Sequence, residues 1–162
     1  MAADVPSILA RLATIEPEVL NPINSVPTYA YASVPFSLNT NDLPSWVNLP
    51  GPMVEDWEVR VGEDSQAKEG LETREFHCTL YIAPAAAGKD GELFAVTEPY
   101  FALCRDMFQS HQSLKALDGI QRVNVLGDGG SQVLPFAGVP YYAIRFRVQI
   151  VSRVRVALAT GE

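Results

Sequence analysis

The sequence predicts an α+β fold, in which two helices pack on one face of an antiparallel or mixed sheet of about five strands. Two observations predict the sheet and the helices. Apolar and polar residues alternate along 72–83 and 141–158, as in strands with one buried face. Apolar residues recur at helical spacing in 4–16 and 97–117. A third observation, the Pro- and Gly-rich stretches between these segments, separates them into distinct elements.

Length and composition favour one domain spanning 1–162. A chain of 162 residues with 48% apolar and 19% charged residues can bury a sizeable core. No stretch approaches the roughly 18 apolar residues of a membrane helix. The N-terminus lacks the basic start and apolar core of a signal peptide. Two cysteines are too few for a disulfide framework. We therefore expect a globular protein that does not enter a membrane.

Residues 4–16 are predicted to form a short amphipathic helix. Asp4 is a suitable N-cap, and Pro6 fits the first turn, where its missing N–H costs nothing. Ile8, Leu12 and Ile15 share one face of the helix.

The following segment, 17–52, holds seven prolines and is expected to contain neither a long helix nor a central strand. Apolar anchors nevertheless argue against a disordered linker. They are Tyr29, Tyr31, Phe36, Leu38, Leu43, Trp46 and Val47. We predict extended pieces at 28–34 and 45–49, pinned onto the core, with a turn at 39–42.

Residues 53–62 and 72–83 are predicted strands, and the polar stretch 62–71 between them a flexible loop or arm. In the second strand Phe76, Cys78, Leu80 and Ile82 face one way. After a loop at 83–93, a helix is predicted to begin at the N-cap Thr97 and to end near Gly119.

Two further strands are predicted at 120–126 and 131–136, joined by a hairpin turn at the Gly-Asp-Gly-Gly of 127–130. The last strand, 141–158, is longer than a typical strand. We expect a bend near Ser152 or an end that projects from the domain.

Arginine side chains form the most distinctive group in the sequence. The net charge is −7, and residues 1–70 carry ten acidic and three basic residues. The polar side of the last strand is basic, with Arg145, Arg147, Arg153 and Arg155, and Arg122 precedes it. We interpret this face as a docking surface for an acidic partner or a neighbouring subunit, because complementary charges guide association. The acidic candidates are Glu55, Asp56, Glu63 and Asp64.

A solvated outer strand face is the alternative interpretation of these arginines, and nucleic-acid binding comes third. An acidic protein is a poor general binder of phosphates, and no aromatic residues alternate with the arginines to stack on bases.

No catalytic, cofactor or metal site is predicted. Cys104 and His111 lie two helical turns apart, too far for a hydrogen bond, so core packing is the better interpretation. His77 and Cys78 are adjacent in a strand and match no zinc module.

Other candidate sites have simpler explanations as well. The glycines of 127–130 lack the Lys-Ser or Lys-Thr of a phosphate loop. The acidic run of residues 55–58 lacks the spaced oxygen ligands of a calcium loop, so a solvated strand end is favoured.

The order of elements resembles the small tail terminator and tail-completion proteins of long-tailed bacteriophages. The stretch YAYASVPFSLNTNDLPSW (29–46) carries part of this resemblance, through Pro35 with Ser37-Leu38 and through Asp42-Leu43-Pro44. The start of the last strand, 138–148, carries the rest. The family has no catalytic motif, so the resemblance transfers no site residue.

The resemblance implies a structural virion protein that forms a ring, usually a hexamer, on the head-proximal end of the tail tube. Its partners would be further copies of itself, the tail tube protein and the head-completion or connector protein, with DNA passing through the lumen. Assembly would take place in the bacterial cytoplasm. The long proline-rich segment leaves a head–tail neck protein open. A small enzyme or ligand-binding domain with a pocket near Cys104 and His111 is the alternative of a different class.

Overall fold

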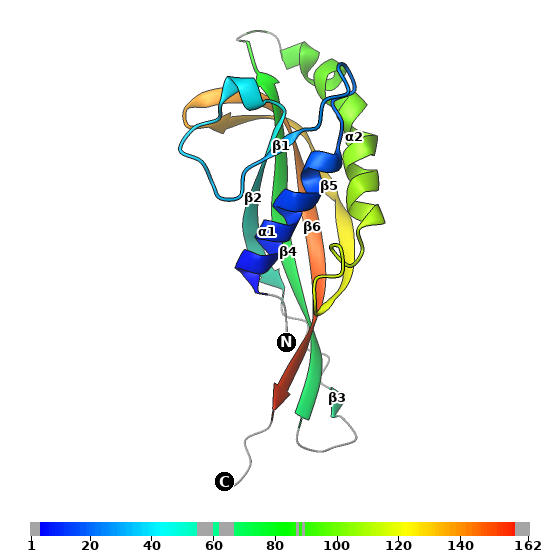
Figure 1. Cartoon of the computed structure of the whole chain (residues 1–162). Coiled ribbons are helices and arrows are strands. Elements are labelled where there is room, and N and C mark those ends of the chain that lie inside the picture. Colours follow the sequence, from blue (N-terminus) through cyan, green and yellow to red (C-terminus); the bar gives the residue numbers. More distant parts are fainter. Residues whose placement is uncertain (1–3, 55–59, 62–66, 87, 89, 158–162) are drawn as a thin grey trace.

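The computed structural model describes residues 4–54, 60–61, 67–86, 88 and 90–157. Within them, one six-stranded sheet has the order β1-β2-β4-β6-β5, with β3 paired to β4. The strands are β1 Tyr29–Ala30, β2 Ser45–Val54, β3 Arg60–Val61, β4 Ala67–Pro84, β5 Ile120–Phe136 and β6 Val139–Ala157. The helices are α1 Val5–Ile15 and α2 Leu93–Ser110, with 3-10 turns η1 Glu16–Glu18, η2 Thr40–Asp42 and η3 Asp90–Glu92. Both α-helices cover the same face of the sheet (Figure 1). The predicted α+β fold is confirmed.

Helix α1 forms as its sequence predicts. The Asp4 side chain accepts a hydrogen bond from the Ser7 amide at 2.8 Å, which satisfies one of the unpaired N–H groups of the first turn. Ile8, Leu12 and Ile15 are buried against the sheet.

The main core lies between the helices and the sheet. Trp46 of β2, Phe108 of α2 and Phe146 of β6 pack together there, with ring centroids 5.7–5.9 Å apart. A second, smaller apolar cluster lies apart from this core and includes Leu38, Val47, Tyr81, Tyr141 and Ala143. The proline-rich segment therefore contributes to both clusters, through Trp46 and Leu38 respectively. The prediction that Phe36 is an anchor is wrong, because its side chain is 98% exposed.

Strand β2 differs from its prediction. It runs from Ser45 to Val54 through Pro50, whereas the sequence predicts separate pieces at 45–49 and 53–62. Residues 55–59 of the second piece lie outside the described residues. Strand β1 pairs in parallel with only the first two residues of β2. Beyond them, the outer side of β2 is an edge of the sheet in the described chain. A proline is tolerated in such an edge strand.

The outer edge of β2 lacks a hydrogen-bond donor at Pro50. The Tyr29 amide donates to the Pro44 carbonyl, and the Tyr31 amide donates to the Trp46 carbonyl. Because strand residues alternate in direction, even-numbered residues of this part of β2 direct their backbone outward. Pro50 therefore occupies an outward position without an N–H.

The opposite edge of the sheet is capped by a side chain. The Gln112 amide group donates to the Val123 carbonyl at 2.8 Å and accepts from the Val123 N–H at 3.2 Å. It thus satisfies both backbone groups of this residue of β5, as a neighbouring strand would.

Strands β4 and β6 form the centre of the sheet and continue beyond it. They pair antiparallel from Tyr141 opposite Pro84 to Ala157 opposite Ala67. Strand β5 leaves β6 at Ser152, so the remaining residues form a narrow extension (Figure 1). The expected projecting end is confirmed, and the β4–β6 register is unbroken at Ser152. The predicted loop 62–71 is wrong from Ala67 onward, because this part belongs to β4.

Helix α2 begins and ends earlier than predicted. Thr97 is not its N-cap: the helix starts at Leu93, and the Thr97 hydroxyl donates to the Leu93 carbonyl at 2.8 Å. Pro99 lies inside the helix, where it removes one backbone hydrogen bond. The helix ends at Ser110, not near Gly119. A turn with positive φ at residues 114–116 follows it.

The predicted hairpin turn at 127–130 is wrong. Strand β5 continues through it, and both flanking parts pair with β6, with a register shift between Leu126 and Gly130. Extra residues on one strand form a bulge, which also favours glycine. The actual turn is Ala137-Gly138, both with positive φ, between Phe136 and Val139. Such two-residue turns match the twist of paired strands.

Candidate interaction face

The predicted arginine face is the face of the sheet opposite the helices. Phe146 and Val148 of β6 belong to the core beneath the helices, so Arg145 and Arg147 must point to the other side. Both are half-buried, whereas Arg153 on β6 and Arg122 on β5 are exposed.

The remaining predicted interface residues are not tested by the structure. Glu55, Asp56, Glu63 and Asp64 lie outside the described residues. Arg155 pairs with Glu69 along the β4–β6 ladder, but its side chain lies outside the described part.

Arg147 is neutralised within the chain. Its Nε donates to Oε1 of Glu75 on β4, and His77 Nε2 lies 3.4 Å from the same oxygen. The Glu75 side chain is only 6% exposed. The hydrogen bond from Arg147 lowers the pKa of the Glu75 carboxyl. The same bond raises the pKa of the Arg147 guanidinium. This contact therefore holds β4 and β6 together and leaves Arg147 poorly suited to binding a partner.

A glycine of β2 makes room for this cluster. A Cβ at Gly51 would lie 3.1 Å from the Glu75 carbonyl oxygen and 3.2 Å from His77 Nε2. Contacts this short require a neighbour to move. Any larger residue would therefore displace the His77 ring or the β4 backbone.

Arg145 has no such partner among the described residues. Its Nε is buried and makes no hydrogen bond there. Across the ladders it lies opposite Thr79 and Gly130, neither of which carries a charge. Tyr81 lies on the same face: burial raises the pKa of its hydroxyl, and the charge of Arg145 opposes that shift. A guanidinium whose Nε has lost its hydration without gaining an acceptor is suited to receive an external carboxylate.

The two cysteines are inert core residues. Cys78 and Cys104 are free, and neither side chain is exposed. Burial raises the pKa of both thiols, which disfavours the nucleophilic thiolate.

A hollow of about 410 Å³ lies beside His111 but does not include Cys104 among its lining residues. His111 Nδ1 contacts the Met107 carbonyl at 2.8 Å, and its Nε2 lies 3.0 Å from Glu18. Both ring nitrogens thus already have partners. In the described chain no three His, Cys, Asp or Glu residues are placed to hold a metal ion. The arrangement needed for a Cys104–His111 site is not present.

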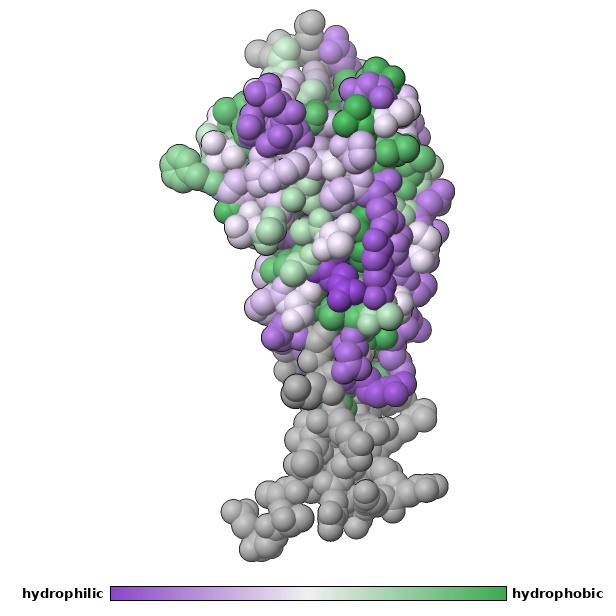
Figure 2. Space-filling view, in the orientation of Figure 1, coloured by the Kyte–Doolittle hydropathy of each residue, from purple (hydrophilic) through white to green (hydrophobic). Residues whose placement is uncertain are grey.

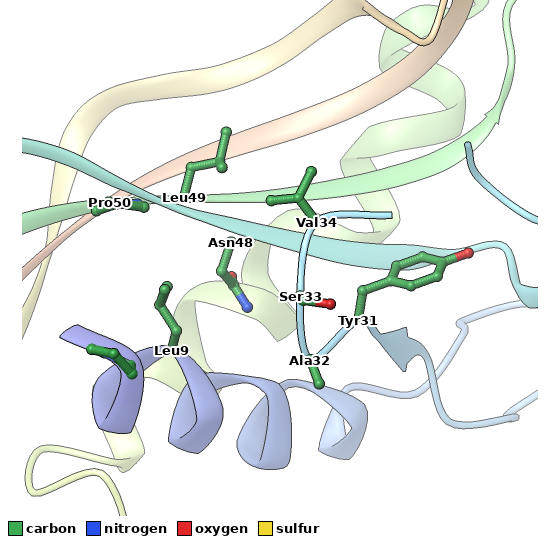
Figure 3. A pocket seen from close by; sticks show the side chains of 9 residues that line it. Leu9, Tyr31, Ala32, Ser33, Val34, Asn48, Leu49 and Pro50 are labelled. Atoms are coloured by element: carbon green, nitrogen blue, oxygen red, sulfur yellow. The ribbon is translucent and has the colours of Figure 1, made fainter. Parts of the chain in front are cut away.

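A second hollow, of about 290 Å³, lies between α1, the segment 31–34 and β2 (Figure 3). Its lining is mostly apolar, with Leu9 and Leu49 among its members, and it includes Asn48. Across the helix-bearing side of the molecule, hydrophobic and hydrophilic residues are interspersed (Figure 2). Neither hollow combines depth with the converging polar groups typical of an active site.

Sequence reasoning missed Glu75, His77 and Gly51. Alternation alone places Glu75 and His77 on the polar side of their strand. Their meeting with Arg147 depends on the β4–β6 register, which periodicity does not supply.

Comparisons with known proteins do not assign the chain to a family. No protein-family model matches it, and no curated protein matches it either. No helix in the described part of the chain has the length and hydrophobicity needed to cross a membrane.

Proposed function

We propose that this protein is a non-enzymatic structural protein of a phage virion, which forms a ring at the head-proximal end of the tail tube. It would end tube polymerisation and join the tail to the head connector. The observation that carries the proposal is Arg145, a half-buried cation without an ion-pair partner among the described residues, on the sheet face that the helices leave uncovered. Such a residue favours association with another surface over catalysis.

Ring formation fits the charges of the chain. Head-to-tail contacts between identical copies join two different surfaces and close into a ring when the rotation permits. The chain supplies both signs of charge: a basic strand face and an N-terminal part, 1–70, with ten acidic residues against three basic ones. An acidic residue of a neighbouring copy would provide the carboxylate that Arg145 lacks.

Arg145 can be replaced without disturbing the Arg147–Glu75 contact, so it is the residue to change in a test of this proposal. Arg147 stabilises the β4–β6 pair, so charge reversal there would disturb the fold as well as the face. Charge reversal at Arg145 alone (R145E) is expected to abolish ring-sized particles while the circular dichroism spectrum stays unchanged. The matched control is R105E, since Arg105 lies exposed on α2 on the opposite side of the sheet. Mass photometry of the purified proteins reports the particle size.

Two outcomes would count against the proposal. Normal assembly of folded R145E would remove the role of Arg145. Wild-type protein that forms no ring, either alone or on added tail tubes in negative-stain micrographs, would remove the proposed function itself.

A head–tail neck or head-completion protein is the alternative within the same class. It would share the ring and the arginine face but bind the connector instead of the tube. Micrographs with tubes and with connectors, compared side by side, distinguish the two.

A further inference from the structure

A carboxyl group is buried where α1 meets the sheet. Glu16 begins η1, directly after α1, and is fully buried. The Asn48 side chain of β2 donates to its Oε1 at 2.5 Å, and the Thr28 hydroxyl donates to its backbone carbonyl at 3.1 Å. Helix α1 is thereby joined to β2 through a polar pair inside an apolar core.

Two atoms of this pair have no partner among the described residues: Glu16 Oε2 and Asn48 Oδ1. Both are acceptors when Glu16 is ionised, so neither can satisfy the other. A proton on Oε2 turns it into a donor, and Oδ1 is the acceptor still available. A carboxylic acid and a side-chain amide can form two hydrogen bonds in one ring, which would leave no buried polar atom of the pair unpaired.

The surroundings of Glu16 favour the neutral acid. No described Arg, Lys or His forms an ion pair with it, although the ion pairs of Glu75 and Glu18 show that such partners occur elsewhere in the chain. The titratable groups that face it are the thiols of Cys78 on β4 and Cys104 on α2, whose pKa values are raised by burial and, when Glu16 is ionised, further by its charge. Burial likewise raises the pKa of Glu16 well above its ordinary value.

We infer that Glu16 is protonated in the folded protein, that it forms a two-hydrogen-bond acid–amide pair with Asn48, and that loss of its proton releases α1 from the sheet. The direction of the pH effect follows because proton binding to Glu16 and docking of α1 are linked equilibria. A carboxyl group whose pKa is raised by folding stabilises the docked state below the ordinary carboxyl pKa. That stabilisation falls as pH rises, until the folded group itself ionises. In this interval the equilibrium constant for opening rises about tenfold per pH unit.

The two thiols report this opening. Cys78 and Cys104 belong to the same core cluster as Ile8, Leu12 and Ile15 of α1, so release of the helix is expected to open the core around them. The experiment labels the full-length protein with dithiodipyridine from pH 5.5 to 7. The comparison is with E16Q, whose neutral amide can form the same pair at every pH. The ratio of wild-type to E16Q labelling rates cancels the intrinsic pH dependence of the thiols.

The ratio is expected to rise about tenfold per pH unit. A ratio that does not change with pH would overturn the inference. A second measurement does not depend on the fold of E16Q: the ¹³C chemical shift of the Glu16 carboxyl in the wild-type protein. The inference requires the shift of a protonated acid at pH 6, and titration at the ordinary carboxyl pKa would contradict it.

Discussion

Neighbouring arginines on one strand differ in their chemistry because their cross-strand partners differ. Arg147 contacts the buried carboxylate of Glu75, whereas Arg145 lies opposite the uncharged Thr79 and Gly130. Alternation predicts that both arginines lie on one face of β6. Only the pairing of β6 with β4 and β5 shows that Arg147 has a structural role and that Arg145 is left for a partner.

The Arg147–Glu75 contact predicts a pH-dependent stability. Arg147 lowers the pKa of Glu75, so the contact stabilises the folded state above the ordinary carboxyl pKa near 4.5 and ceases to do so as pH falls through the lowered folded pKa. R147Q is therefore expected to lower Tm at pH 7 and to have a smaller effect at pH 3. Thermal unfolding at both pH values measures this.

The double variant E75Q/R147Q is the control for this prediction. Without a buried charge left unpaired, it is expected to recover part of the lost Tm at pH 7. Equal shifts for R147Q at the two pH values would argue that Arg147 acts through packing of its aliphatic part.

At the scale of elements, α2 is fixed to β5 by a hydroxyl pair between the buried Thr97 and the half-buried Ser131. The Thr97 hydroxyl donates to the Leu93 carbonyl and lies 2.6 Å from Ser131 Oγ. Thr97 is fully buried, so the loss of its hydroxyl leaves Ser131 without this partner. This explains why Thr97 lies within the helix in spite of a sequence context typical of an N-cap.

The variant T97V is expected to lower the free energy of unfolding by about 1 kcal/mol, the net contribution of a typical hydrogen bond, because the half-buried Ser131 loses its partner. Adding S131A should cost little more, because both partners are then apolar. T14V provides a matched control: the Thr14 hydroxyl makes the same bond to a carbonyl four residues earlier, but on the exposed side of α1. Chemical denaturation measures all three, and equal losses in T97V and T14V would contradict the argument.

Local signals account for the elements that the sequence predicts well. Asp4 and Pro6 define the start of α1, and strict alternation defines much of β4 and β6, because capping and burial act within a few residues. The errors arise where long-range pairing overrides a local signal. The glycines of 127–130 satisfy a turn pattern, yet β6 pairs on both sides of them. Glu75 and Arg147 are 72 positions apart in sequence, so no local pattern predicts their contact.

At the scale of the whole molecule, the main core joins both helices to the sheet and predicts one unfolding transition. Cys78 and Cys104 come from different elements but belong to the same cluster. At neutral pH without denaturant, both are expected to resist alkylation over minutes, and with rising urea both should become reactive at the same midpoint. Mass spectrometry of the alkylated peptides gives the two curves.

A different outcome would revise this view of the molecule. Two separate midpoints would contradict the single domain of 1–162. Rapid alkylation of native Cys104 alone would revive the hypothesis of an enzymatic site near His111.

Pro50 and Gln112, at the two borders of the sheet, have a consequence for the behaviour of concentrated protein. Pro50 on β2 offers an incoming strand no N–H donor. On β5, Gln112 already occupies both the N–H and the carbonyl of Val123, so an incoming strand finds neither a donor nor an acceptor there. At these two positions a continuous sheet cannot pass from one molecule to the next, so contacts between copies there are made through side chains. Both devices hinder the edge-to-edge pairing from which cross-β fibrils grow at high local concentration.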